Sequence, residues 1–133
     1  EDLGLQVWAH PALEKFLEEQ YKSLFFARKI VPTGYGGEMR PPHSVFAANF
    51  VRTQRMVFIC PIWDGIDASQ NLSRHIEILK SEGMQMIFFE IDLGQPWQVN
   101  LTPVLLENGF TPRLVLPYAG LADIVMFQYR EGV

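Results

Sequence analysis

The sequence has little of what marks several large classes of protein. Its single cysteine, Cys60, excludes an internal disulfide framework and is typical of a reducing compartment. Apolar runs are shorter than the roughly 18 residues that a membrane-spanning helix needs, and no signal-peptide pattern is present. We therefore expect a cytoplasmic protein without a membrane partner.

Clustered positive charge is also missing. The net charge is −4, and the arginines are scattered without a basic run, whereas nucleic acids are bound by concentrated Lys and Arg. We therefore expect no nucleic-acid partner. The sequence also lacks a metal-binding motif, because the spacing of His10, His43 and His75 from one another and from Cys60 matches no set of metal ligands. We expect no metal site.

What the chain does contain is an internal repeat. Residues 10–32 and 95–117 align without a gap, so that proline, phenylalanine, arginine and proline recur at matched positions: Pro11 with Pro96, Phe25 with Phe110, Arg28 with Arg113, and Pro32 with Pro117. Each copy predicts a strand, a helix with proline in its first turn, a short turn and a second strand. We expect the two units to be related by a pseudo-twofold axis or to lie side by side in one sheet.

The remaining elements follow from periodicity and turn residues. The first half predicts strands over 3–9, 25–31 and 56–62, a helix over 12–24, a glycine-rich loop over 33–42, and a linker over 44–55 that feeds the third strand. The second half predicts a helix capped by Ser69 and stopped by Gly83, then a strand over 85–93. Pro96 opens a further helix with the apolar stripe Val99, Leu101, Leu105 and Leu106, and the strands 113–116 and 122–129 form a closing hairpin.

The third helix contains a second proline, Pro103, which predicts a kink or a late start there. The predicted order is β-α-β-β-α-β-α-β-β, a mixed, mainly antiparallel sheet with flanking helices. We expect a single domain over 1–133, with repeat unit one at about 3–62 and a helix plus repeat unit two at about 70–130. Because the sequence begins with Glu1, we also expect it to be a fragment of a longer protein.

The second half resembles the C-terminal half of the GNAT-type N-acetyltransferase fold, in which a helix, a long central strand, a helix and a β-hairpin follow one another. The resemblance lies in residues 91–93, 107–110, 116–117 and 123–129. In the first half, the dipeptides His10-Pro11, Gly34-Tyr35, Gln54-Arg55 and Cys60-Pro61 are similar to bacterial proteins that join a histidine-kinase-like (anti-sigma-factor-like) ATPase domain to acetyltransferase-like domains. This resemblance implies an acetyltransferase-like fold in a bacterial signalling protein.

Enzymes of this family hold the coenzyme A diphosphate on a glycine-rich loop before a helix, where backbone N–H groups are exposed. The matching segment here, 63–71, contains Gly65, Ser69 and Asn71 as the residues that would contact the cofactor. It has one glycine and two aspartates, whose carboxylates would repel a diphosphate. We therefore expect the cofactor loop to be absent or broken.

The resemblance also suggests catalytic candidates. Glu90 and Asp92 alternate along the central strand, where a general base would lie, or they form a solvated strand end. Tyr118 and Tyr129 lie in the closing hairpin, where a general acid would lie, or they serve packing or a partner contact. Cys60 is either a small buried hydrophobe or, with exposure and a base, a nucleophile.

These observations favour a non-catalytic, acetyltransferase-like sensory or protein-interaction domain that needs no cofactor and that could bind a small metabolite in its cleft. Its partner would be another protein or the upstream domains of the same chain, and open sheet edges predict a homodimer. The alternative is an acyl-CoA-dependent N-acyltransferase with an atypical cofactor loop, which would use acetyl-CoA.

Overall fold

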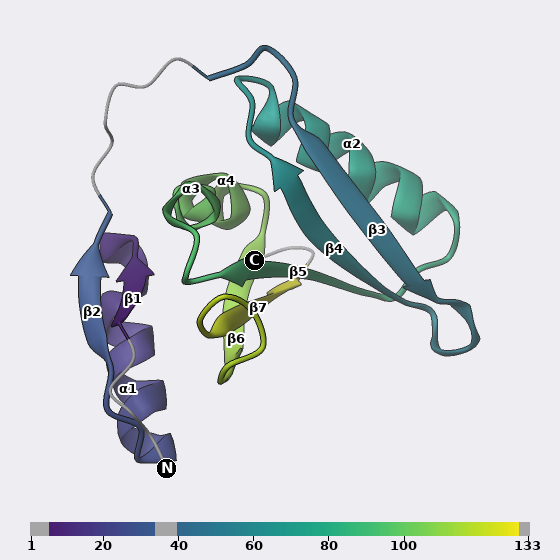
Figure 1. The fold of residues 1–133 in the computed structure, drawn as a ribbon. Coiled ribbons are helices and arrows are strands. Elements are labelled where there is room, and N and C mark those ends of the chain that lie inside the picture. The colour runs from purple at the N-terminus through teal and green to yellow at the C-terminus, as the bar shows by residue number, and fades with distance from the viewer. Residues whose placement is uncertain (1–5, 34–39, 131–133) are drawn as a thin grey trace.

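The computed structural model describes residues 6–33 and 40–130 and shows a mixed α/β protein, as expected (Figure 1). A five-stranded sheet has the strand order β3-β4-β5-β7-β6, and a separate two-stranded sheet pairs β1 with β2. Most of the loop expected over 33–42, with its Gly34-Tyr35 dipeptide, and the start of the strand expected over 3–9 lie outside the described residues.

The two-stranded sheet belongs to a small β-α-β unit at the start of the chain. Strand β1 (Gln6–Ala9) leads into a 3-10 turn (Pro11–Leu13), helix α1 (Glu14–Leu24) and strand β2 (Lys29–Pro32), which is parallel to β1. His10 caps the 3-10 turn, because its Nδ1 accepts a hydrogen bond from the Ala12 N–H at 3.1 Å. The helix ends at Phe25, which has a left-handed φ of 58° and is 92% exposed.

The five-stranded sheet combines antiparallel pairs with one parallel pair. Strands β3 (Val45–Val51) and β4 (Met56–Trp63) are antiparallel, and β5 (Met86–Asp92) is parallel to β4. Helix α2 (Ala68–Ser81) makes the crossover that this parallel connection requires. Strand β7 (Ile124–Tyr129) is inserted between β5 and β6 (Phe110–Leu116), antiparallel to both.

The prediction of a linker over 44–55 is wrong, because most of this segment forms β3 and a 3-10 turn at Arg52–Gln54. The order therefore gains a strand, and with the third helix divided into two it becomes β-α-β-β-β-α-β-α-α-β-β. The residues of β3 that favour strands, valine and phenylalanine, lie at its two ends. Two alanines lie between them and interrupt the alternation of apolar and polar residues that would have indicated a strand.

The stop and start signals of the helices were mostly predicted correctly. Gly83 follows α2 with φ 83°, and Gly109 follows α4 with φ 88°. The late start at Pro103 is confirmed, because α3 (Pro96–Val99) stops and α4 (Thr102–Glu107) begins with Pro103 in its first turn. Ser69 is not the cap of α2, since Asp67 occupies that position.

The repeat holds for local structure but not for strand pairing. Both copies form a strand, a proline-started helical segment and a strand. The copies lie in different sheets, however, joined by a hydrogen bond from the Trp8 N–H to the Leu93 carbonyl at 2.8 Å. Phe25 is exposed where its counterpart Phe110 is buried, so the matched residues have different environments.

The core lies between the five-stranded sheet and its helices. Alternate residues of β4 and β5 are buried, and α2 adds the buried side chains of Leu72, Ile76 and Leu79. On the opposite sheet face, the half-buried rings of Phe58 and Phe88 stack at 5.1 Å. Leu106, expected in the buried stripe of the third helix, is 40% exposed. Within the described residues, no helix combines the length and apolar character needed to span a membrane.

Candidate functional site

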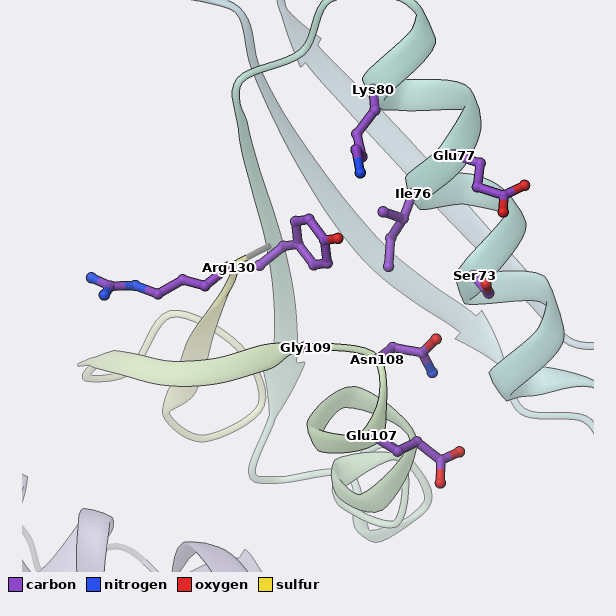
Figure 2. A pocket seen from close by; sticks show the side chains of 9 residues that line it. Ser73, Ile76, Glu77, Lys80, Glu107, Asn108, Gly109 and Arg130 are labelled. Carbon is purple, nitrogen blue, oxygen red and sulfur yellow. The ribbon is translucent and has the colours of Figure 1, made fainter. Parts of the chain in front are cut away.

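A hollow of about 390 Å³ lies between α2 and the turn that follows α4. Helix α2 forms one wall of the hollow with the side chains of Ser73, Ile76, Glu77 and Lys80. The opposite wall consists of Glu107, Asn108 and Gly109, with Tyr129 and Arg130 at the end of β7. Figure 2 shows Ile76 and Lys80 pointing into this space, whereas the guanidinium of Arg130 points away from it.

Tyr129 is the one catalytic candidate from the sequence that lines the hollow. Its ring lies 5.6 Å from the Phe110 ring and 5.9 Å from the Lys80 ammonium. Gly109 leaves room for this ring, because a side chain at that position would come within 3.2 Å of it. The hollow therefore offers an aromatic surface, an ammonium group and the polar side chains of Asn108 and Ser73.

The loop before α2, where the resemblance places a cofactor diphosphate, already uses several of its backbone donors. The Gly65 N–H donates to the Asp64 carboxylate at 2.7 Å, the Ile66 N–H to the Pro41 carbonyl at 2.8 Å, and the Ala68 N–H to the Gly65 carbonyl at 3.1 Å. The segment 40–44 lies directly on the loop, so that a side chain at Gly65 would collide with the backbone of His43 and Ser44.

Asp67 adds a negative charge at this helix start. Its carboxylate accepts hydrogen bonds from the backbone N–H of Ser44 at 2.6 Å and from the Ser44 hydroxyl at 2.8 Å. The backbone hydrogen bond from Ser44 is the main reason that the pKa of Asp67 is lowered, and the Ser44 hydroxyl and His43 act in the same direction against burial. A second anion would meet a carboxylate here that stays ionised at neutral pH.

The other loop candidates from the sequence also make internal contacts. The Asn71 side-chain amide donates to the Ser44 carbonyl at 3.2 Å and to its hydroxyl at 2.9 Å. The Ser69 hydroxyl accepts a hydrogen bond from the Asn108 amide at 3.1 Å, which connects α2 to the end of α4 beside the hollow. Gly65, Ser69 and Asn71 therefore hold neighbouring segments together.

Glu90 lies on the sheet face away from α2, next to Cys60. The Cys60 thiol donates to the Glu90 carboxylate at 3.4 Å. Burial, followed by the Glu90 charge, raises the pKa of Cys60 to about 11, so the thiol is protonated at neutral pH. Cys60 thus has a neighbouring carboxylate but lacks the thiolate that a nucleophile requires.

Asp92 organises a turn. Its carboxylate accepts hydrogen bonds from the backbone N–H groups of Gly94 at 2.9 Å, Leu121 at 2.6 Å and Ala122 at 3.1 Å. Gly120 packs directly against this carboxylate, so closely that a side chain there would collide with it. Glu90 and Asp92 share a sheet face but contact different partners.

Tyr118, which is 51% exposed, lies over a buried charged pair that the sequence analysis did not predict. Asp123 is completely buried and accepts hydrogen bonds from the Tyr21 hydroxyl at 2.7 Å, Arg28 Nε at 2.7 Å and the Tyr118 N–H at 3.0 Å. The Arg28 guanidinium lies 5.0 Å from the Tyr118 ring centre and 4.8 Å from that of Phe26. A signal was available, because Asp123 is a single charge between the apolar residues Ala122 and Ile124.

Two of the four catalytic candidates, Glu90 and Tyr129, lie on opposite faces of the sheet, and the other two lie at the turn between β6 and β7. Tyr129 lines the hollow on the helix side, Glu90 contacts Cys60 on the other face, Asp92 accepts hydrogen bonds from the turn, and Tyr118 lies over the buried pair. The described residues contain no group of three or more His, Cys, Asp or Glu side chains placed to hold a metal ion.

The chain matches no family model, and comparisons with curated proteins and with solved structures give no significant match.

Proposed function

We propose that this chain is a non-catalytic, acetyltransferase-like module that acts in sensing or protein interaction in a bacterial signalling protein. The observation that carries this proposal is the state of the loop before α2. Three of its backbone N–H groups donate within the protein, and the ionised Asp67 lies at the helix start. A coenzyme diphosphate would find neither free donors at these positions nor a favourable charge.

The succession of elements supports the acetyltransferase-like part of the proposal. Helix α2 is followed by the central strand β5, the helical pair α3 and α4, and the hairpin β6-β7, which is the order that the resemblance implies. The placement of Glu90 and Tyr129 on opposite faces of the sheet supports the non-catalytic part, because a general base and a general acid must both reach the reacting group.

The hollow beside Tyr129 is where a sensory module of this kind would bind a small metabolite. Its lining combines the Lys80 ammonium with the Glu77 and Glu107 carboxylates, which suits a polar ligand, while the Tyr129 ring and Ile76 would contact an apolar part of that ligand. The same hollow favours the alternative, an acyl-CoA-dependent N-acyltransferase with an atypical loop, because it places a tyrosine next to open space.

Thermal unfolding with coenzyme A and acetyl-CoA separates the two functions. A ligand at a hundred times its dissociation constant stabilises the folded state by about 2.7 kcal/mol, which is a measurable rise in Tm. We expect no rise at millimolar ligand and no acyl transfer to amine substrates. A rise that disappears in a Tyr129→Ala variant would replace the proposal with the acyltransferase, and Tyr118→Ala, remote from the hollow, is the matched control.

A further inference from the structure

The two edges of the five-stranded sheet are protected very differently. Strand β6 contains Pro112 and Arg113, and its pairing with β7 is irregular between Pro112 and Leu114. Proline, charge and irregular register are the means by which sheets block unwanted pairing. Strand β3 has no proline and no charged residue between Val45 and Val51. Within the described ranges it pairs only with β4, so its outer edge is open.

The sequence of β3 reads almost the same in both directions, Val-Phe-Ala-Ala-Asn-Phe-Val. Two copies related by a twofold axis at Ala48 would place Val45 opposite Val51, Phe46 opposite Phe50 and Ala47 opposite Asn49. Antiparallel neighbours interact through such cross-strand pairs, and a twofold interface requires a surface that complements itself. The β3 register is regular for this purpose, because the irregularity beside Val45 adds the extra residue to β4.

Charge at the two ends of β3 is complementary in the same arrangement. The ionised Asp67 is bound to Ser44, just before the strand begins, and Arg52 follows directly after it ends. In an antiparallel pair, the start of one copy meets the end of the other. Arg52, which lies over the Phe50 ring and 3.8 Å from Glu82 in its own chain, would therefore approach Asp67 of the other copy. Like charges would not be brought together along the strand.

Exposed apolar side chains also gather along this edge. Phe50 is 37% exposed although it lies on the same sheet face as the buried Phe46. Above them, His75 of α2 contacts the Phe46 ring at 5.8 Å, and Ile78, three residues further along α2, is 57% exposed. A second copy would cover Phe50 and extend the row of edge-to-face rings that Phe110, Phe89 and Phe46 form.

We propose that two copies of this chain associate through β3, antiparallel and centred on Ala48, to form one continuous ten-stranded sheet (Figure 1 shows β3 at the end of the five-stranded sheet). This interface does not rest on the proposed function: it shares Asp67, at the start of α2, with the loop discussed there, but it does not involve the hollow beside Tyr129 and holds whether or not coenzyme A binds. Each copy would contribute only β3 and the side of α2 next to it. Because small interfaces of this kind give weak complexes, we expect a reversible dimer whose population depends on concentration.

Charge variants at paired, exposed positions test both the edge and the register. The double variant Val45→Lys, Val51→Lys places a lysine of one copy opposite a lysine of the other at both ends of β3. We expect the dissociation constant of the dimer to rise about tenfold or more. Val45→Lys with Val51→Glu places lysine opposite glutamate in the same register, and we expect the dimer to be retained. Leu114→Lys on β6, where the side chain has similar exposure, is the control that should leave association unchanged.

Sedimentation velocity over a range of concentrations up to several hundred micromolar measures the association, and circular dichroism verifies that each variant is folded. The expected wild-type result is a species of twice the 15.3 kDa chain mass. A wild-type monomer throughout the range would overturn the proposal. A dimer that persists in the lysine-lysine variant, or dissociates equally in the lysine-glutamate variant, would overturn the assigned edge or register.

Discussion

The buried pair of Arg28 and Asp123 gives the sharpest prediction for stability. Neither side chain is exposed to solvent, and the Nε–Oδ2 distance is 2.7 Å. Asp123→Asn preserves the shape of the side chain but leaves the guanidinium buried without its counter-charge. Breaking a buried pair in this way costs about 3–5 kcal/mol of the free energy of unfolding. For a domain of this size, that loss corresponds to a fall in Tm of roughly 10–20 °C.

Urea unfolding at pH 7 measures this loss directly. Tyr21→Phe removes one hydrogen bond to the same carboxylate and should cost about 1.5–3 kcal/mol, less than Asp123→Asn. Arg28→Met combined with Asp123→Asn should cost clearly less than the sum of the single changes, because the second substitution removes a charge that has already lost its partner.

Glu82→Gln is the matched control for charge removal. Glu82 and Arg52 are exposed and 3.8 Å apart, so their separation should cost less than about 1 kcal/mol. A cost for Asp123→Asn no larger than that of Glu82→Gln would refute the reasoning. Simple additivity of the Arg28 and Asp123 substitutions would refute the coupling between them.

Two further predictions concern single ionisable groups. Because the pKa of Cys60 is raised from 9.0 to about 11, its thiolate at pH 8 is roughly a hundredfold scarcer than in the unfolded chain, and iodoacetamide should react far more slowly with the native protein. Glu90→Gln should speed native alkylation, and equal native and unfolded rates would contradict the assigned environment. For Asp67, the folded pKa is lowered from the ordinary value of 3.8, so its contribution to stability is present above that value and is lost as pH falls through the folded pKa. The difference in unfolding free energy between wild type and Asp67→Asn should therefore shrink between pH 5 and pH 3 in urea titrations, whereas a constant difference would show that Asp67 acts without its charge.

Much of the fold was predictable because its signals are local. Pro11, Pro96 and Pro103 mark helix starts, and Gly83 and Gly109 mark helix ends, through backbone properties that neighbouring elements do not change. The alternation of buried residues in β5 also follows directly from its sequence.

The strand pairing was not predictable because it depends on contacts between distant segments. Matched residues of the repeat face different surroundings, so Arg28 finds Asp123 whereas its counterpart Arg113 is exposed. Two of the three backbone N–H groups that donate to Asp92, those of Leu121 and Ala122, likewise belong to a turn about thirty residues later in the chain. Sequence patterns indicated where a carboxylate lies along a strand but not which donors it meets.

The contact between Arg28 and Asp123 spans 95 positions of the chain, and it sets an order of events during synthesis. The first β-α-β unit leaves the ribosome long before its carboxylate partner is made. Until the β6-β7 hairpin emerges, Arg28 lacks its contact with Asp123, so the small unit cannot reach its final packing. This β-α-β unit therefore completes its folding only after the β6-β7 hairpin has been translated.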